Sequence, residues 1–284
     1  MTGFKIGGVP EHFNLPWRLA IEEGRFREAG IDLHWSDMGG GTGQMIRGLE
    51  SGSLDIAVLL TEGITKAILE GLKAKRVQVY VVTPLHWGIH VPYHSDIKTV
   101  DELNGKTFAI SREGSGSHLM TYVKASQEGW NTADLKFNVV GDIYGGLWAL
   151  ENNEAQAFLW EKYTTFPFTE QGKCKYIDEV VTPWPCFVVA VREEIALNEP
   201  ELIKKICEIV NKNTLEVKRD ENTVEIISWR YNLRSGQVQN WLIETDWNYD
   251  GIEYPLAFDK VIRYLMKLNL IKEEQAANWQ KKLF

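Results

Sequence analysis

The sequence predicts an α/β protein made of two doubly wound α/β domains that are joined by a two-strand hinge. Three observations lead to this fold class. Strand-like and helix-like segments alternate along the first part of the chain, the alternation restarts after about residue 90, and only helices follow residue 199. Strand–helix–strand repetition with short connections favours a mostly parallel sheet covered by helices. A chain of 284 residues is long enough for two domains of ordinary size.

The first domain is expected to contain a run of parallel strands with helices between them. The apolar run Leu54–Leu60 is typical of a strand buried on both faces. Leu15, Leu19 and Phe26 share one helical face, which predicts a helix over Leu15–Arg27. Thr61 can cap the helix that follows the buried strand. The other predicted strands are Phe4–Val9, Ile31–Ser36 and Val77–Thr83, and a glycine turn at Gly39–Gly43 leads into a further short helix.

The second domain repeats this pattern. Thr99 and Glu102 have the spacing of a capping box. The predicted strands are Thr107–Ser111, Phe137–Val140, Ala157–Trp160 and Phe187–Val191, and the predicted helices are Ser117–Glu128 and Gly146–Asn152.

Helices that follow an α/β body without new strands must pack on a part that is already built. We therefore expect the chain to leave the first domain near residue 85, build the second, and return near residue 189. Domain I is then 1–85 with 190–284, and domain II is 86–189. The two crossings make a hinge. The helices predicted for the tail are Glu199–Arg219, Thr223–Tyr231, Ser235–Thr245, Pro255–Leu268 and Lys272–Lys282.

The composition is typical of a soluble globular protein, with 44% hydrophobic and 25% charged residues and a net charge of −8. The basic residues are dispersed, so we expect no nucleic-acid partner. No apolar run reaches membrane-spanning length, so we expect no membrane insertion. The strand-like Phe4–Val9 comes directly after the start and no leader-like segment precedes it, which favours a cytoplasmic protein. The alternative is a periplasmic or surface-anchored protein whose signal peptide has been removed.

The three cysteines, Cys174, Cys186 and Cys207, are odd in number and fit no metal motif. We expect them to be small buried residues in a reducing compartment. His86, His90 and His94 are four residues apart, but Pro92 argues against a helix and a strand would spread them too far for one metal. The sequence therefore predicts neither a metal nor a cofactor.

Several motifs follow one another in a distinctive order along the chain. They are Lys5–Gly7, Glu11–Pro16, Ala20–Phe26, Glu28–Leu33, Gly39–Gly43, Leu49–Ala57, Asp101–Lys106, Ser111–Ser117 and Pro200–Leu202. This order resembles the substrate-binding proteins of sulfonate, taurine and thiamine-precursor transporters. It also resembles the yeast-type thiamine pyrimidine synthase, which shares the type II periplasmic-binding-protein fold, and the chain is most similar to the signal-less members from fungi and some bacteria. The resemblance covers essentially the whole chain and implies that a ligand lies in a cleft between the two domains.

Ligands of open α/β sheets bind at the carboxyl ends of strands, near helix N-termini, and the resemblance places the same segments at the cleft. The predicted ligand-binding residues are Glu11, His12, Phe13, Asn14, Gly41, Thr42, Thr61, Glu62, His86, Ser115, Ser117, His118, Trp160, Glu161 and Trp184. Aromatic residues of these segments, together with Trp17 and Trp87, could form walls for a ring, or could pack in the core.

Two features of this set have alternative interpretations. Glu62 and Glu161 each follow a buried strand, where a carboxylate could bind an amine, a ring N–H or a hydroxyl, or could simply cap a helix. The Gly114–His118 segment opens a helix whose free N–H groups could hold an acceptor or anionic group. The alternative there is an ordinary serine-capped helix.

The sequence predicts a solute-binding protein that captures a small polar or aromatic ligand by hinge closure. The alternative is a cytosolic enzyme on the same fold, of the thiamine-pyrimidine or menaquinone-pathway type. The synthase resemblance implies a cysteine-rich run before the return strand and a lysine and histidine after the third strand. In this chain the segment 182–187 contains a single cysteine, Cys186, and the segment 58–64 contains neither lysine nor histidine. We predict no catalytic residue. The expected partners are a small-molecule ligand and, if the protein is exported, an ABC transporter permease.

Overall fold

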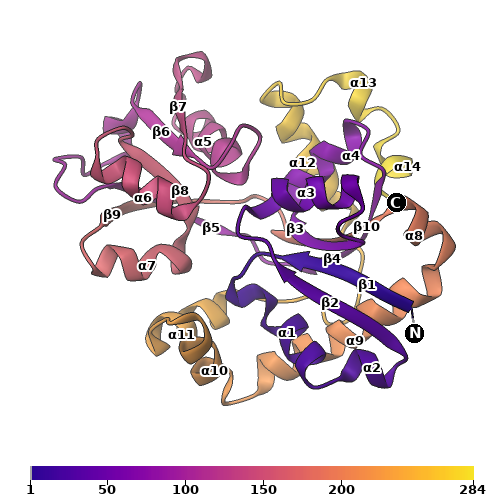
Figure 1. Cartoon of the computed structure of the whole chain (residues 1–284). Helices are drawn as coiled ribbons and strands as arrows, with labels where there is room; N and C mark the ends of the chain where they lie inside the picture. The colour runs from indigo at the N-terminus through magenta and orange to yellow at the C-terminus, as the bar shows by residue number, and fades with distance from the viewer. Residues whose placement is uncertain (1) are drawn as a thin grey trace. The chain divides into compact units, whose positions relative to one another are not determined.

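The computed structural model describes residues 2–284, which form two compact units (Figure 1). Unit 1 comprises Met1–Pro84 and Pro183–Phe284, and unit 2 comprises Leu85–Thr182. The chain thus returns to unit 1 about seven residues earlier than the sequence analysis placed it. The reason is that the strand Phe187–Arg192 pairs with strands of unit 1 along its length and so belongs to that unit. Within the described part of the chain, no helix is both long and apolar enough to cross a lipid bilayer.

Unit 1 is built on a five-stranded mixed sheet in the order β2-β1-β3-β10-β4. β1 runs parallel to both β2 and β3, whereas β10 lies antiparallel between β3 and β4. The strands are β1 (Thr2–Gly8), β2 (Ile31–Asp37), β3 (Ile56–Leu60), β4 (Ala74–Val81) and β10 (Phe187–Arg192). All residues of β3 are buried, in agreement with its continuous apolar sequence.

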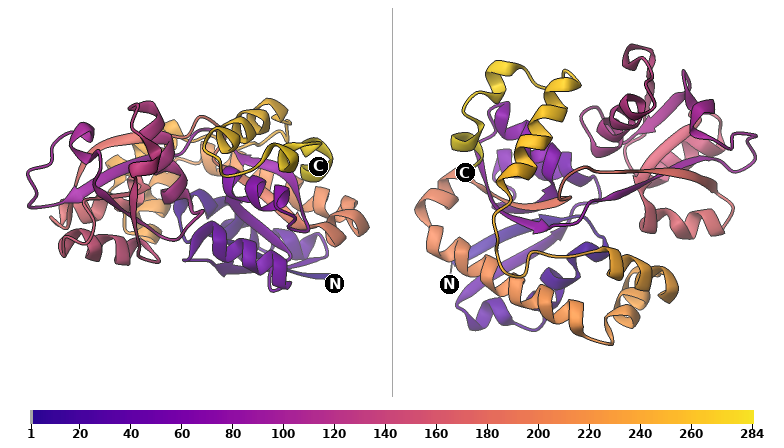
Figure 2. Two further views of the ribbon diagram at one scale, coloured as in Figure 1. Left: turned by 90° about the horizontal axis from the view of Figure 1, so that it is seen from above. Right: turned by 180° about the vertical axis from the view of Figure 1, so that it is seen from behind.

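Helices cover both faces of this sheet (Figures 1 and 2). α1, α2 and α9 pack together on one face, and α3, α4 and α12 pack on the other. The helices that precede the crossing are α1 (Leu15–Glu22), α2 (Arg25–Glu28), α3 (Gly41–Ser51) and α4 (Thr61–Leu69). Those that follow it are α8 (Glu193–Asn198), α9 (Pro200–Arg219), α10 (Thr223–Tyr231), α11 (Ser235–Glu244), α12 (Pro255–Lys267), α13 (Glu273–Ala276) and α14 (Trp279–Leu283).

The helix predicted over Leu15–Arg27 is broken in the structure. α1 ends at Glu22, and Gly24 adopts a left-handed conformation with φ of 77°, which a helix interior cannot accommodate. The break turns the chain so that α2 can bring Phe26 back onto Trp17, whose ring stacks on that of Phe26 with centroids 6.0 Å apart. Both side chains are buried, so the interruption serves the core.

Unit 2 repeats the sheet arrangement of unit 1, with the order β7-β6-β8-β5-β9. β6 runs parallel to β7 and β8, and β5 lies antiparallel between β8 and β9. The strands are β5 (His86–Pro92), β6 (Thr107–Ile110), β7 (Lys136–Val139), β8 (Ala157–Glu161) and β9 (Cys174–Val181). The helices are α5 (Gly116–Gln127), α6 (Ile143–Glu151) and α7 (Lys162–Glu170), with short 3-10 helices at Val100–Leu103 and Thr132–Asp134. A further 3-10 helix, His12–Asn14, belongs to unit 1.

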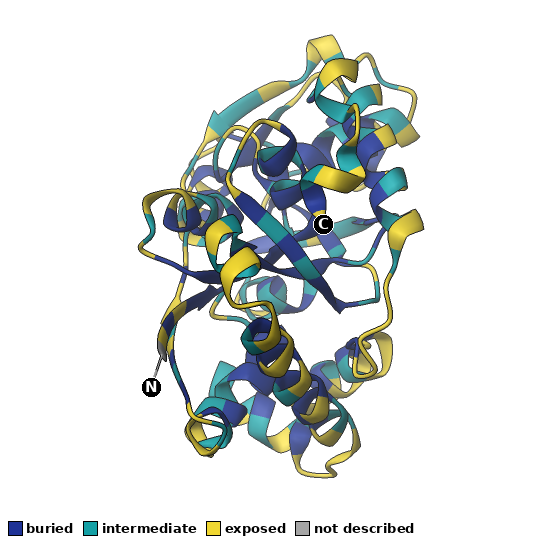
Figure 3. Cartoon of the chain, turned by 90° about the vertical axis from the view of Figure 1, so that its right-hand side faces the viewer, coloured by how far each residue is buried: buried dark blue, intermediate teal, exposed yellow. Residues whose placement is uncertain are grey.

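Burial follows the strands and the inward helix faces (Figure 3). In unit 2, Leu147 and Leu150 of α6 pack with Phe158 of β8 and with Cys174 of β9. Cys174, Cys186 and Cys207 are all buried, as the sequence predicted, and none of them forms a disulfide bond. The capping box of Thr99 and Glu102 is also present.

Two glycines in helices allow a matched test of the packing in unit 2. A Cβ at Gly146 would lie 2.4 Å from the Phe158 ring, whereas a Cβ at Gly236 of α11 would meet nothing within 4 Å. We expect Gly146→Ala to lower the free energy of unfolding by about 1–3 kcal/mol because the core is already filled. Gly236→Ala should leave it unchanged or raise it by up to about 1 kcal/mol. Urea denaturation measures both, and equal effects of the two variants would contradict this packing.

Candidate functional site

Most of the predicted ligand-binding residues belong to unit 1, whose parallel strands all end on the same side of the sheet. The carboxyl ends of the parallel strands β1, β2 and β3 lie at this edge, and β10 begins there because Phe187 pairs with Leu60. Nine of the fifteen predicted ligand residues belong to unit 1: Glu11, His12, Phe13, Asn14, Gly41, Thr42, Thr61, Glu62 and Trp184. The other six belong to unit 2: His86, Ser115, Ser117, His118, Trp160 and Glu161.

Thr61 ties the start of α4 to the segment that leads into β10. Its backbone N–H donates to the carbonyl oxygen of Cys186 at 3.0 Å, and its hydroxyl donates to the carbonyl oxygen of Pro185 at 2.5 Å. The prediction that Thr61 caps α4 is therefore wrong: Leu60 occupies the N-cap position without a side-chain cap. The Thr61 hydroxyl instead bonds to Pro185, in the segment that returns to unit 1, and sequence periodicity could not show this contact.

Glu62, in the first turn of α4, is a buried carboxyl group that is only half satisfied. The indole Nε1–H of Trp184 donates to its Oε2 atom at 2.9 Å. Its Oε1 atom has no hydrogen-bond partner among the described residues, and the residue is 1% exposed. Burial raises the pKa of this carboxyl to about 7, although the Trp184 indole and the backbone N–H of Glu62 itself act in the opposite direction.

Trp184 is held in place from the C-terminal part of the chain. Its ring meets that of Tyr264 on α12 edge to face, with centroids 5.5 Å apart. The side chain is 2% exposed. Trp184 therefore connects the return segment, α4 and α12, and its N–H is oriented toward Glu62.

The residues that follow β1 contribute mainly to the core. The buried His12 ring packs between Phe13 and Trp241, at centroid distances of 5.0 and 4.2 Å. Burial lowers its pKa to about 3, so the imidazole is neutral. The Phe13 ring packs against Phe187. The predicted aromatic wall is thus core packing at His12, Phe13 and Trp17.

A pocket of about 240 Å³ adjoins the carboxyl ends of β1 and β2 in unit 1. Arg18 and Asp37 form an ion pair across it at 3.0 Å, and the Trp35 indole donates to the same carboxylate. The sequence analysis named Glu11 and Asn14 here but missed the others. Asp37 could have been found because it ends β2, whereas Arg230 lies far along the chain. The lining residues are Val9, Pro10, Glu11, Asn14, Arg18, Trp35, Asp37, Arg230 and Tyr231.

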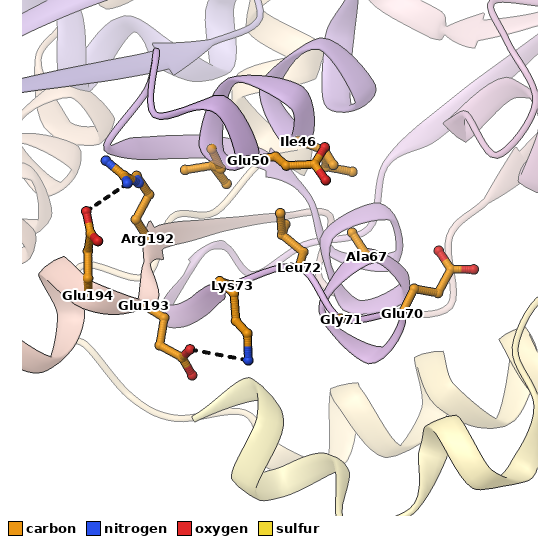
Figure 4. A pocket seen from close by; sticks show the side chains of 11 residues that line it. Ile46, Glu50, Ala67, Glu70, Gly71, Leu72, Lys73, Arg192, Glu193 and Glu194 are labelled. Carbon is orange, nitrogen blue, oxygen red and sulfur yellow. Dashed lines mark ion pairs between the residues drawn. The ribbon is translucent and has the colours of Figure 1, made fainter.

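A larger pocket, of about 590 Å³, lies at the opposite edge of the unit 1 sheet, where β10 ends (Figure 4). Ile46, Leu49 and Leu72 contribute apolar lining. Four of its charged groups form two ion pairs: Arg192 with Glu194 at 2.7 Å, and Lys73 with Glu193 at 4.0 Å. No predicted ligand residue lines this pocket, and its paired charges leave little for a ligand to satisfy.

In unit 2, side chains of the Gly114–His118 segment form hydrogen bonds with the backbone of the same region. Ser115 is the N-cap of α5 and accepts the backbone N–H of His118 at 3.3 Å. Ser117 accepts the N–H of Ser111 at 3.0 Å, and Nδ1 of His118 accepts the N–H of Gly114 at 2.9 Å. Burial lowers the pKa of His118, in agreement with an imidazole that acts as an acceptor. The structure therefore shows a serine-capped helix here, the second of the two interpretations given for this segment.

Glu161 differs from Glu62 although both follow a buried strand. Its Oε1 atom accepts the N–H of Tyr163 at 3.1 Å, and its Oε2 atom accepts the N–H and the hydroxyl of Thr164 at 2.6 and 2.7 Å. Glu161 is therefore the N-cap of α7, a helix that the sequence analysis missed. Nearby, His86 contacts Glu179 at 3.1 Å, and the half-buried Trp160 packs on Phe158.

Comparison with known proteins identifies the fold. The structure of the Candida albicans CA3427 gene product, described as defining a new family with the generic periplasmic binding protein fold, aligns with a TM-score of 0.91 at 22% identity, over 99% of this chain and 95% of that chain. The alkanesulfonate-binding protein SsuA from Xanthomonas axonopodis pv. citri, bound to MOPS, aligns with a TM-score of 0.84 at 16% identity, over 100% and 98%. The nitrate-binding protein NrtA from Synechocystis PCC 6803 aligns with a TM-score of 0.78 at 15% identity, over 99% and 86%.

The chain therefore has the type II periplasmic-binding-protein fold, which confirms the fold that the motif order predicted. Within that class, residues 87–180 match the family model described as Ca3427-like PBP. No curated protein sequence matches the chain.

The Glu62 carboxyl predicts a pH dependence of stability. Its pKa of about 7 in the folded state lies above the ordinary value of 4.5, so the folded protein holds this proton more tightly than the unfolded chain does. Its contribution to the unfolding free energy is therefore largest at low pH and is lost as the pH rises from about 4.5 to 7. The loss amounts to at most about 3 kcal/mol. Denaturation between pH 4.5 and 8 should show a shallower loss of stability in Glu62→Gln than in the wild type, because only the contribution of Glu161, whose pKa burial also raises, then remains. Glu50→Gln, an exposed control, should keep the wild-type slope.

Glu161 should behave as a structural cap. Replacement by alanine leaves the first N–H groups of α7 without their acceptor and should lower the free energy of unfolding by about 1–2 kcal/mol. Urea denaturation measures the loss, and hydrogen exchange should locate it in α7. Unchanged exchange in α7 would show that the cap contributes nothing.

Proposed function

We propose that this protein reversibly binds a small polar or aromatic ligand, with Glu62 as a contact from unit 1, and that its two units close about the crossing segments when the ligand binds. The observation that carries the proposal is the Oε1 atom of Glu62, a buried oxygen that has no hydrogen-bond partner within residues 2–284. A buried carboxyl group in this state is costly unless something else supplies a hydrogen bond. It lies where ligands of open α/β sheets bind.

The structural relatives support a binding function. SsuA and NrtA are described as alkanesulfonate-binding and nitrate-binding proteins, and a structure from Staphylococcus aureus as the ligand-binding component of an ABC-type import system. The last aligns with a TM-score of 0.75 at 15% identity, over 95% of this chain and 93% of that chain. If the protein is exported, the partner that we propose is an ABC transporter permease.

No feature of the site favours the enzyme alternative. A reactive cysteine needs an accessible thiolate beside a cation or a helix N-terminus. Cys186 is 0% exposed, and its backbone N–H and C=O pair with Thr83 and Thr61. The role that its backbone plays does not depend on the sulfur.

We therefore expect Cys186→Ala to bind ligand with an affinity within a few-fold of wild type. The packing cost should be about 1 kcal/mol, because the side chain is small and buried. Calorimetric titration and mass spectrometry of the incubated ligand check both points. A chemical product that wild type forms and the variant does not would favour the enzyme.

The binding function itself is tested by a thermal-shift screen of pyrimidines, amines, amino-sulfonates and small aromatic acids. A ligand at a hundred times its dissociation constant should stabilise the protein by about 2.7 kcal/mol. Glu62→Gln should weaken the binding of that ligand at least tenfold, whereas Glu50→Gln should not. Small-angle X-ray scattering should show a smaller radius of gyration with the ligand. Unchanged affinity in Glu62→Gln would remove Glu62 from the site, and no hit in the screen would argue against the function.

A further inference from the structure

We infer that the ligand which contacts Glu62 is an organic cation, such as a primary ammonium or amidinium compound, and not an anion. This inference rests on the proposed function and names the class of ligand. It separates the protein from the relatives described as binding an alkanesulfonate or nitrate.

The first argument is the chemistry of Glu62 Oε1, one of several buried side-chain atoms without a hydrogen-bond partner among the described residues. Oε1 of Glu62 is a carboxylate oxygen, and an ionised carboxylate can only accept hydrogen bonds. The other oxygen already accepts from Trp184. A ligand that completes the ionised form of this group, which predominates above its pKa of about 7, must therefore donate, and an N–H that carries positive charge donates most strongly.

The second argument is that the first two backbone N–H groups of α4 are already bonded. Helix N-termini bind anions through free backbone N–H groups. Here the N–H of Thr61 donates to Cys186, and the N–H of Glu62 bonds to its own carboxyl group. The Glu62 carboxylate thus occupies the place at this helix end that a ligand anion would take.

The third argument is that, among residues 2–284, no charged side chain is found to act on the Glu62 carboxyl. Apart from burial, the groups that act on its carboxyl are its own backbone N–H and the Trp184 indole. Of the elements packed against α4, α12 contributes the titratable Tyr264, which contacts the Trp184 ring. A cationic ligand would supply the missing positive charge, whereas an anion would add a second negative charge in a site of low dielectric.

The experiment uses matched pairs of probes on the full chain. Benzylamine is compared with phenylmethanesulfonate, and butylamine with butane-1-sulfonate, by calorimetric titration at pH 6 and pH 8. Both amines stay protonated over this range, so a change in affinity reports on the protein. We expect the amines to bind at least tenfold more tightly than the sulfonates, and their affinity to rise about five- to tenfold from pH 6 to pH 8 as Glu62 ionises.

Two variants link the effect to Glu62. Glu62→Gln, with its fold checked by circular dichroism, should lose both the preference for amines and the pH dependence. Trp184→Phe keeps an aromatic ring but removes the N–H that stabilises the carboxylate, so the pH at which amine affinity rises should move upward. A purely structural role of Trp184 would not move that pH.

The outcomes separate the inference from the proposed function. Tighter sulfonate binding that depends on Glu62 would overturn the inference and leave the binding function standing. If neither pair binds, the charge of any hit from the wider screen decides: a cation supports the inference, and an anion or a neutral compound overturns it. Absence of any ligand would overturn both.

Discussion

The sheet of unit 1 depends on one antiparallel strand that the chain supplies late. β10 forms hydrogen bonds with β3 on one side and β4 on the other, and its residues from Phe187 to Val191 are buried. Buried backbone N–H and C=O groups must be paired, so without β10 the facing edges of β3 and β4 would be unsatisfied. The direction of β10 matters equally for the site. Because β10 begins where β3 ends, the chain just before it brings Trp184 against Glu62.

Unit 2 also depends on one antiparallel strand between two others, and there the chain makes that strand first. Its fourth strand, β5, is antiparallel to both neighbours and is the first strand after the chain leaves unit 1, as β10 is the first after it returns. The crossing segments also bond to each other: Leu85 and Thr182 pair twice at the ends of unit 2, and the N–H of Cys186 donates to Thr83 in unit 1. The crossings are therefore ordered extensions of the sheets on which they end.

The sequence allowed the fold to be predicted but only part of the site chemistry. Strands such as Ile56–Leu60 were visible because both faces are buried and the apolar run is continuous. β9 was missed because polar residues interrupt its pattern, and α7 because Pro167 lies inside it. The two glutamates show the limit most clearly. Both follow a buried strand, yet Glu161 is satisfied by its own helix, whereas the state of Glu62 depends on a tryptophan 122 residues away. Local pattern cannot distinguish a near partner from a distant one.

The late arrival of β10 has a consequence for biosynthesis. As the polypeptide emerges from the ribosome, the first 84 residues supply four of the five strands of unit 1, but the place between β3 and β4 stays empty. All of unit 2 is translated before the missing strand appears. Unit 2 can therefore fold as a continuous segment before unit 1 is complete. Until then, the strands in the first 84 residues have unpaired edges, which are prone to aggregation. A nascent chain of this design gains most from chaperone protection over its first third, and a ribosome that stalls before residue 187 leaves unit 1 without the strand that joins β3 to β4.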